Sequence, residues 1–322
     1  MTMFRLLTFI FMFVAATASA QDMRVTLLGT GTPILNVNRF GMSTLVEANG
    51  HKLLFDAGRG AAIRLHQRQV PLRDITAIFI THMHSDHLTS LPDLYATAPL
   101  PTDDGRRTTP LALWGPPGIK KVATGIETMF SENNRIRLLG GEVKKTALKI
   151  RATQIKPGVI FDKDGITVTA FLVNHGHVEP AYGYRIDYAG HSVVLSGDTS
   201  YIPALVAKAR NVDLLVHSVA IGSRALEQAE PAYVNRFYEY LANPETLARI
   251  LTEAAPAQAV ASHISLYSRG DIPRATEAEL LERVQAGYQG PFIIGQDLMS
   301  FVISKAGTKL DPYDSRSRQR EP

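Results

Sequence analysis

The residues of this chain with the greatest capacity for chemistry lie together in the segment THMHSDH, Thr81–His87, which follows the apolar run ITAIFI. The continuous apolar run predicts a strand that is buried on both faces. His82 and His84 are two residues apart, so in an extended segment their side chains point to the same side. The turn that follows can bring Asp86 and His87 to a neighbouring point. Because one ion cannot take all four ligands without strain, we expect two adjacent metal ions.

Three further candidate ligands follow apolar runs elsewhere in the chain. His175 follows the run FLVN, Asp198 lies in VVLSGDT, and His263 lies in AVASHIS. Asp198 stands in a glycine turn, where its carboxylate could bridge both ions. Histidine and carboxylate ligands suit zinc, and manganese or iron are compatible with them. We therefore expect two divalent metal ions as cofactors, most readily zinc.

The elements that must position these residues alternate between β-type and amphipathic helical runs, which predicts an α/β fold. The pair Asn49-Gly50 predicts a two-residue hairpin turn. Further strands are expected within residues 23–31, 75–80, 111–118, 165–176, 182–198, 212–218, 257–264 and 291–297, and helices near 61–69, 119–133, 201–210, 231–240, 244–255 and 274–286. We expect one domain over residues 21–305, followed by a polar tail at 306–322.

Composition narrows the class of protein. The chain has 322 residues, 45% of them hydrophobic and 20% charged, which suits a large globular core. The formal net charge is +4, and basic residues occur only in short pairs such as Arg106-Arg107 and Lys144-Lys145. Nucleic-acid binders usually gather lysine and arginine into a patch. We therefore expect a small-molecule ester substrate and consider nucleic acid an unlikely partner.

The N-terminal segment predicts export. Residues 1–20 contain a basic Arg5, a short apolar run and the small-residue pattern Ala18-Ser19-Ala20, which is the layout of a cleavable signal peptide. We expect a periplasmic or secreted protein with no stable membrane anchor after cleavage. The chain has no cysteine, so neither a disulfide nor a thiolate ligand is available.

These segments carry a family resemblance. THMHSDH resembles the signature of the metallo-β-lactamase superfamily. The segments LGTGTP (28–33), LLFDAGRG (53–60), YGYRI (182–186), SGDT (196–199), DLLVHS (213–218) and SHIS (262–265) resemble the ribonuclease Z branch, and within it the exported arylsulfatase-like and phosphodiesterase-like hydrolases. The resemblance implies a four-layered αβ/βα sandwich with the ions at one edge of two facing sheets.

The resemblance also implies how the ligands divide between the ions. One ion would take His82, His84, His175 and Asp198, and the other would take Asp86, His87, Asp198 and His263. His177 is the alternative to His175: the alignment with the branch favours His175, and the spacing of shorter relatives favours His177. Asp56 in LLFDAG is similar to the family's carboxylate that fixes a ligand histidine.

The expected reaction is ester hydrolysis. Two close cations lower the pKa of a bridging water, and the resulting hydroxide attacks the ester. Asp86 could orient that hydroxide, and His217 could protonate the leaving group. The resemblance to ribonuclease Z is incomplete, because Ser218 replaces a glutamate of that branch and a late histidine is missing. These departures favour substrates with good leaving groups, such as aryl sulfate or phosphate esters.

A further departure concerns RNA. Ribonuclease Z enzymes carry a long tRNA-clamping arm between the segments that correspond to YGYRI and SGDT, and here only residues 187–195 lie between them. Three alternative functions remain: a ribonuclease Z-type tRNA 3′ endonuclease, a lactonase and a non-catalytic metal-binding protein. Arg59, Tyr182, Tyr184 and Tyr267 are candidates for the mouth of the site. A homodimer is compatible with the resemblance.

Overall fold

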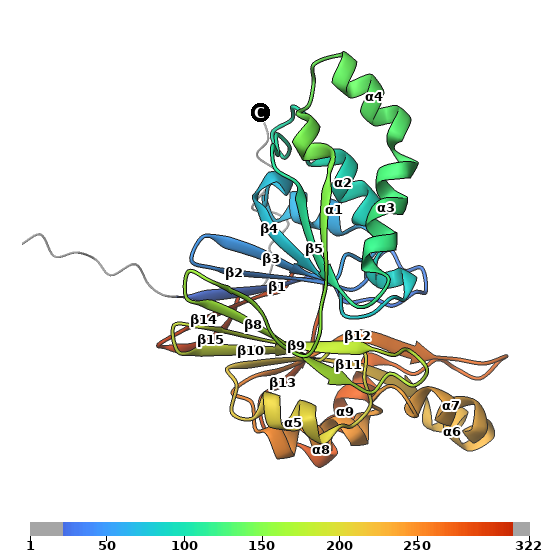
Figure 1. Cartoon of the computed structure of the whole chain (residues 1–322). Coiled ribbons are helices and arrows are strands. Elements are labelled where there is room, and N and C mark those ends of the chain that lie inside the picture. The colour runs from blue at the N-terminus through green and yellow to red at the C-terminus, as the bar shows by residue number, and fades with distance from the viewer. Residues whose placement is uncertain (1–21, 312–322) are drawn as a thin grey trace, which may run out of the picture.

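The computed structural model describes residues 22–311. The signal peptide expected at residues 1–20 and the tail beyond residue 311 lie outside the described residues. Two sheets face each other, and helices cover the outer face of each (Figure 1). Within residues 22–311 one sheet has eight strands and the other has seven.

The first sheet contains the N-terminal half of the domain and the last two strands. Its order is β15-β14-β1-β2-β3-β4-β5-β6. The strand bounds are β1 Met23–Gly29, β2 Ser43–Ala48, β3 His51–Phe55, β4 Ile75–Phe79, β5 Leu111–Gly115, β6 Ile150–Gln154, β14 Ser300–Ser304 and β15 Gly307–Asp311. Strands β3 to β6 run parallel, so their carboxyl ends meet at one edge of the sheet.

The second sheet contains the middle of the chain. Its order is β13-β12-β11-β10-β9-β8-β7. The strand bounds are β7 Gly158–Lys163, β8 Ile166–Val173, β9 Ala181–Tyr188, β10 His191–Leu195, β11 Leu214–Gly222, β12 Ala259–Tyr267 and β13 Phe292–Ile294. Strands β10 to β13 are parallel, so their carboxyl ends also share an edge.

The helices fall into two groups by position in the chain. Those that cover the first sheet are α1 Ala61–Gln67, α2 Leu91–Thr97 and α3 Ile119–Met129, and α4 Ser131–Leu139 follows α3 and extends beyond the sheet (Figure 1). Those that cover the second sheet are α5 Pro203–Ala209, α6 Arg224–Ala229, α7 Pro231–Tyr238, α8 Pro244–Ala254 and α9 Glu277–Gly287. Short 3₁₀ turns lie at η1 Leu72–Asp74, η2 Ser85–His87 and η3 Lys145–Leu148.

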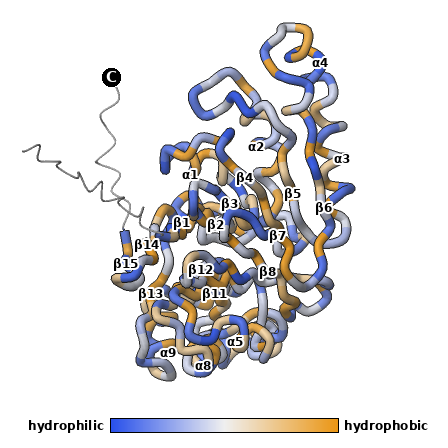
Figure 2. The backbone as a smooth tube through the Cα atoms, turned by 60° about the vertical axis from the view of Figure 1, so that its left-hand side comes forward, coloured by the Kyte–Doolittle hydropathy of each residue, from blue (hydrophilic) through white to orange (hydrophobic). Residues whose placement is uncertain are grey.

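Three apolar clusters hold the four layers together. One contains side chains of both sheets, such as Phe55 and Tyr184, and fills the space between them. A second lies between the first sheet and its helices, and a third lies between the second sheet and α5, α8 and α9. Figure 2 shows the hydrophobic runs along the strands, while the outer turns are hydrophilic. This arrangement is the four-layered αβ/βα sandwich that the family resemblance implies.

Local signals predict most elements well. Asn49 and Gly50 have φ values of 44° and 75° and connect β2 to β3, as expected of a primed turn. The helix expected over 119–133 is two helices, α3 and α4. The strands β6, β7, β14 and β15 were not predicted, because they are short and their sequences are mostly polar or mixed. Strand β15 lies beyond the domain boundary expected at residue 305, since its backbone pairs with β14.

The connection between β9 and β10 is a two-residue turn. Tyr188 pairs with His191, and Ala189 and Gly190 form the turn with φ values of 53° and 86°. No protruding arm therefore lies at this position of the described chain, as the sequence predicts. Among residues 22–311, no helix has both the length and the apolar character needed to cross a bilayer.

Candidate metal centre and active site

The expected ligands come together where the carboxyl ends of the two sheets face each other. The segment after β4 supplies four of them, and His175 and Asp198 follow the ends of β8 and β10. His263, which was expected just past a strand, lies within β12 at the bulge where the register against β11 shifts. Gly197 allows the approach of Asp198, because a Cβ at Gly197 would lie 2.5 Å from the carbonyl oxygen of Tyr182. The topology thus gathers residues separated by as many as 181 positions.

His82, His84 and His175 form the first group. The Nδ1 atom of His84 lies 3.0 Å from Nε2 of His82 and 3.3 Å from Nε2 of His175. Zinc–nitrogen bonds of 2.0–2.1 Å in a tetrahedral site place ligand atoms roughly 3.3 Å apart. The three ring nitrogens are therefore spaced as ligands of one ion.

Asp86, His87 and His263 form the second group. Nε2 of His263 lies 3.1 Å from Oδ2 of Asp86, and Nε2 of His87 lies 3.5 Å from the same oxygen. His263 has a left-handed φ of 44° at a register shift between β11 and β12, and this bulge turns its side chain into the site.

Asp198 lies between the two groups. Its Oδ2 atom is 3.3 Å from Nε2 of His263, 3.7 Å from Nε2 of His87 and 3.8 Å from Nε2 of His175. One carboxylate oxygen therefore faces nitrogens of both groups. This is the position that a bridging ligand requires.

Asp56 fixes the orientation of His87. Its carboxylate accepts hydrogen bonds from the backbone N–H of Thr81 at 2.8 Å and from the Thr81 hydroxyl at 2.9 Å, and it lies 2.7 Å from Nδ1 of His87. Asp56 is buried and has a left-handed φ of 57°. With Nδ1 held by Asp56, Nε2 of His87 points at the carboxylates of Asp86 and Asp198.

His175 is held in a similar way by a backbone group. Its Nδ1 atom lies 3.1 Å from the carbonyl oxygen of Tyr240, and its ring packs against the Tyr240 ring at 5.3 Å. This leaves Nε2 of His175 to face His84 and Asp198. The loop after α7 therefore positions a ligand of the first group.

The pKa values of the candidate histidine ligands are shifted in different directions, because burial lowers them and neighbouring carboxylates raise them. Burial, together with the neighbouring His87, lowers the pKa of His82 well below its ordinary value, and burial lowers the pKa of His175. Burial alone would lower the pKa of His87, but the carboxylates of Asp56 and Asp198 outweigh it and raise that pKa well above its ordinary value.

The pKa values of the two carboxylates are lowered by neighbouring histidines, although burial alone would raise them. Burial would raise the pKa of Asp198, but His263 and His87 outweigh it and lower that pKa well below its ordinary value. Burial likewise opposes ionisation of Asp86, while the hydrogen bond from His263 and the charge of His87 lower its pKa. Both carboxylates are therefore held ionised.

The site fits a pair of divalent cations. Nε2 of His87 is buried and has no hydrogen-bond partner within the described residues, although two carboxylates face it. Cations placed between these groups would satisfy both the lone pair and the carboxylates. Such ions supply Lewis acidity and lower the pKa of a bound water.

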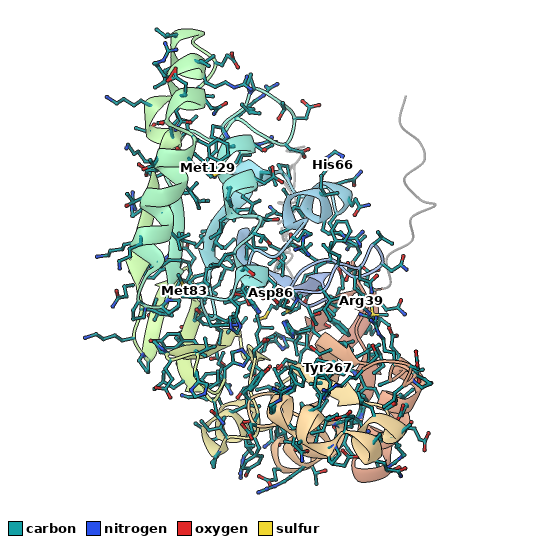
Figure 3. The ribbon with its side chains drawn as sticks, turned by 90° about the vertical axis from the view of Figure 1, so that its right-hand side faces the viewer. Arg39, His66, Met83, Asp86, Met129 and Tyr267 are labelled. Carbon is teal, nitrogen blue, oxygen red and sulfur yellow. The ribbon has the colours of Figure 1, made fainter. Side chains whose placement is uncertain are left out.

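The centre opens into a cavity of about 350 Å³. Its floor contains His84, Asp86, His175, Asp198 and His263. The remaining lining comes from the segment Thr32–Ile34 on one side, and from α7, the loop after it and the end of β12 on the other. Figure 3 shows Asp86 at the level where the two halves meet, with Tyr267 on the half that carries the second sheet.

The other sequence candidates lie outside the floor of this cavity. His177 is exposed and belongs to none of the candidate metal groups of the described chain, whereas His175 does. His217 is buried in β11, its Nδ1 atom lies 2.6 Å from the Ser218 carbonyl oxygen, and it does not line the cavity. Burial lowers the pKa of His217 to about 4. The geometry therefore does not place His217 where a leaving group could take its proton.

Of the four residues suggested for the mouth, the structure brings only Tyr267 to the cavity. Tyr182 and Tyr184 are core residues, because their hydroxyls bond the carbonyl oxygens of Ile155 and Ile80 between the sheets. Arg59 is exposed elsewhere. Alternation along β9 could have revealed the inward orientation of both tyrosines, since Tyr182 and Tyr184 share one face of the strand.

Comparisons with known proteins agree with this geometry. The family model for the beta-lactamase superfamily domain matches residues 51–264. The chain belongs to this superfamily. It is 32% identical over 274 residues to the ribonuclease Z of Mycobacterium sp. (strain KMS), covering 85% of this chain and 94% of that protein. These relatives support the ribonuclease Z-like branch and a metal-dependent hydrolase, and the superfamily generally binds divalent metals.

Solved structures show the same fold. The metallo-β-lactamase-fold protein YhfI from Bacillus subtilis aligns with a TM-score of 0.64 at 18% identity, over 88% of this chain and 99% of that one. The short form of human tRNase Z aligns with a TM-score of 0.61 at 21% identity, over 87% of this chain and 98% of that one. At these identities the likeness shows the fold alone.

The comparisons correct one expectation. We expected a small-molecule ester substrate and considered nucleic acid unlikely, and the curated relatives named ribonuclease Z contradict this. The expectation rested on a missing arm and on dispersed charge, which concern how RNA is held rather than which bond is broken. A phosphodiester in RNA and one in a small molecule place the same demands on the two-cation site.

Proposed function

We propose that this superfamily member is a metal-dependent phosphodiester hydrolase that acts on RNA, as its ribonuclease Z relatives are named to do. The observation that carries the proposal is the convergence of seven candidate ligands on one edge of a domain that matches a ribonuclease Z over 94% of its length. The same ligands are our proposal for the metal set, with zinc as the proposed ion. The relatives thus favour the ribonuclease alternative over the sulfate or small phosphate ester that the sequence suggested first.

The side chains suggest how the reaction would proceed. Water is the nucleophile, and the Asp86 carboxylate is placed to accept a hydrogen bond from it and so to orient its attack on phosphorus. Asp56 acts through His87, because it holds the Nδ1 side of that ring. The expelled ribose oxygen must gain a proton, and the position of His217 favours solvent in the cavity as the source over this side chain.

The test is cleavage of an RNA with a 3′ trailer by the zinc-loaded protein. We expect endonucleolytic cutting that requires added metal, and loss of at least a hundredfold in rate for His84→Ala. A 2′-deoxy substitution at the cut position should leave cutting intact, because the nucleophile is water and not the neighbouring 2′-hydroxyl. A zinc-loaded protein that leaves this RNA and single-stranded RNA intact would refute the proposal.

The export signal is a separate proposal. Mass measurement of the protein recovered from its source organism should give a mature chain that begins at Gln21. If the chain begins at Met1 instead, the segment is not cleaved. An exported enzyme would meet RNA outside the cytoplasm, so the RNA substrate is better sought among extracellular fragments than among tRNA precursors.

A further inference from the structure

The cavity over the ligands has one wall made of aromatic rings. Tyr233 and Phe237 come from α7, Tyr240 from the loop after it, and Tyr267 from the end of β12. The Phe237 and Tyr267 rings stack at 4.1 Å with an interplanar angle of 24°. Phe237 also packs edge-on against Tyr233 at 5.3 Å and Tyr240 at 6.2 Å. All four rings are half-buried, so each keeps exposed surface.

This wall is joined to the metal centre. The Tyr240 carbonyl faces Nδ1 of His175, and the Tyr240 ring packs against the ring of that ligand. A group resting on the aromatic rings would therefore lie beside any phosphate held at the ligands. The two parts of the cavity are close enough to bind one molecule.

The rim of the same cavity carries a free positive charge. Arg274 lines the cavity, is exposed, and has no ion-pair partner within residues 22–311. Arg269, by comparison, is paired with Glu230 and lies over the Tyr233 ring. An unpaired guanidinium near a site that handles phosphate esters is suited to a second phosphate.

The aromatic rings, the proposed cations at the floor and the charge at the rim together match the parts of a nucleotide. We propose that Phe237 and Tyr267 form a nucleobase-stacking subsite for the nucleotide next to the cleaved phosphate, with Arg274 holding the following phosphate. This inference rests on the proposed ribonuclease function and names how its substrate is gripped. Stacking on aromatic rings tolerates every base, because each base has a π face, so the subsite should read RNA without strong sequence preference.

The test compares two ligands that differ only in the base. Adenosine 5′-monophosphate and ribose 5-phosphate are titrated into the zinc-loaded protein by calorimetry. We expect the nucleotide to bind about tenfold more tightly, which is within the range for one stacked base. Phe237→Leu and Tyr267→Leu should each reduce this ratio toward one. Arg274→Gln should leave the ratio unchanged, because Arg274 is proposed to hold a further phosphate that neither ligand carries.

Tyr201→Leu is the matched control, because Tyr201 is a half-buried aromatic residue like Phe237 and Tyr267 but lies outside the cavity. It should retain the tenfold ratio. Thermal melting confirms that each variant is folded, and the two leucine variants test the same point independently. Equal binding of both ligands to the unmodified protein, or an unchanged ratio in both folded leucine variants, would overturn the subsite.

The outcome also separates the subsite from the proposed function. Base-dependent binding without any RNA cleavage would refute the ribonuclease function and support the subsite. RNA cleavage with equal binding of the two ligands would refute the subsite alone.

A second and independent observation concerns charge. Residues 119–151, which contain α3, α4 and η3, carry eight basic and three acidic side chains, a net charge of +5 compared with +4 for the whole chain. The acidic residues are paired within the segment, and five basic residues have no acidic partner among the described residues: Lys120, Lys121, Lys144, Lys145 and Arg151. All five are exposed.

Part of this segment, helix α4, projects from the body of the domain (Figure 1). Helix α4 has no buried residue and extends beyond the first sheet (Figure 1). Helix α3 begins beside the metal centre, because a Cβ at Gly118 would lie 3.3 Å from Met83, which stands between His82 and His84. Figure 3 shows the same helix rising from the level of Met83 toward Met129.

We infer that residues 119–151 form a basic arm that holds the RNA backbone, in place of the arm that is absent between β9 and β10. RNA binding is measured at several salt concentrations for a double variant, Lys120→Gln with Lys121→Gln. We expect about tenfold weaker binding at low salt and a slope of log affinity against log salt that is shallower by about one per lysine.

The matched control is Lys305→Gln with Lys309→Gln, which removes the same charge from the exposed β14–β15 hairpin. It should leave affinity and slope close to those of the unmodified protein. Equal losses of RNA affinity in the two double variants would mean that only the net charge of the protein matters. This result would refute the proposed role of residues 119–151. An arm variant with unchanged RNA affinity but reduced binding to anionic lipid vesicles would assign the arm to a membrane surface instead.

Discussion

The contact between Asp56 and His87 allows a sharp prediction for the change Asp56→Asn. The asparagine is nearly isosteric and tolerates the left-handed φ of 57° at this position. Its amide can offer an oxygen to the Thr81 N–H or to Nδ1 of His87, but not to both. If the oxygen stays on Thr81, the amide N–H₂ faces His87, and the imidazole must move its proton to Nε2, the atom that would bind the metal.

The size of the effect follows from these contacts. One charge-assisted hydrogen bond is lost, and one buried donor loses its partner or forces the other tautomer, so unfolding should be easier by about 2–3 kcal/mol. Losing a group that orients a ligand histidine typically weakens metal binding by about 10–100-fold. We therefore expect one of two metal equivalents to bind 10–100-fold more weakly, with an intact fold at room temperature.

The assay is competition with a chromophoric chelator, which resolves the two equivalents, combined with a urea unfolding curve. The control is Asp213→Asn, because Asp213 accepts a hydrogen bond from the Ser192 N–H and faces His191 at 3.7 Å, away from the cavity. It should bind both metal ions normally. The reasoning fails if Asp56→Asn loses stability but keeps two equivalents at unchanged affinity, since Asp56 would then be structural only.

Three further predictions concern other parts of the molecule. His217→Gln should lower the RNA cleavage rate by less than about tenfold, because a true general acid contributes about 10²–10⁴-fold, and single-turnover rates check this. The pKa values of His87 and His263 are raised, so metal uptake should strengthen as the pH rises above about 6.5, because the metal displaces their protons. Calorimetry in buffers of different ionisation enthalpy should show that metal binding releases protons. In the metal-free protein, the two protonated histidines contribute fully to stability below about pH 6.5, and this contribution is lost as the pH rises through their raised pKa values. Arg283→Met should reduce stability by about 2–3 kcal/mol in urea unfolding without changing metal content, because the buried guanidinium bonds the half-exposed Glu245 at 2.8 Å.

The convergence of the candidate ligands was accessible to sequence analysis because two simple regularities act together. Apolar runs predict buried strands, and parallel strands place their carboxyl ends at one edge. The four residues after β4, together with His175, Asp198 and His263, all follow such runs, so their convergence needs no knowledge of side-chain packing. The preference for His175 over His177 is a finer prediction, and it agrees with the burial of His175 beside the other candidate ligands.

The parts that escaped prediction depend on contacts distant in the sequence. Nothing local in Tyr240 indicates that its carbonyl faces His175, which is 65 positions away. The stacking of Phe237 on Tyr267 requires α7 to pack beside the end of β12, and neither segment shows this by itself. Strands such as β7 were missed because an edge strand with few buried residues lacks the apolar run that identifies a central one.

The mistaken view of nucleic acid has the same physical origin. A net charge of +4 over the whole chain is mild, and the basic pair Lys144-Lys145 alone indicates little. Electrostatic attraction depends on where charges lie in space rather than on the net charge of the whole chain. Residues 119–151 contain Lys120, Lys121 and this pair, while most of the compensating carboxylates lie elsewhere in the chain. The absence of one clamping arm therefore says nothing about a basic surface built from another part of the fold, and charge is better judged by structural segment than by chain.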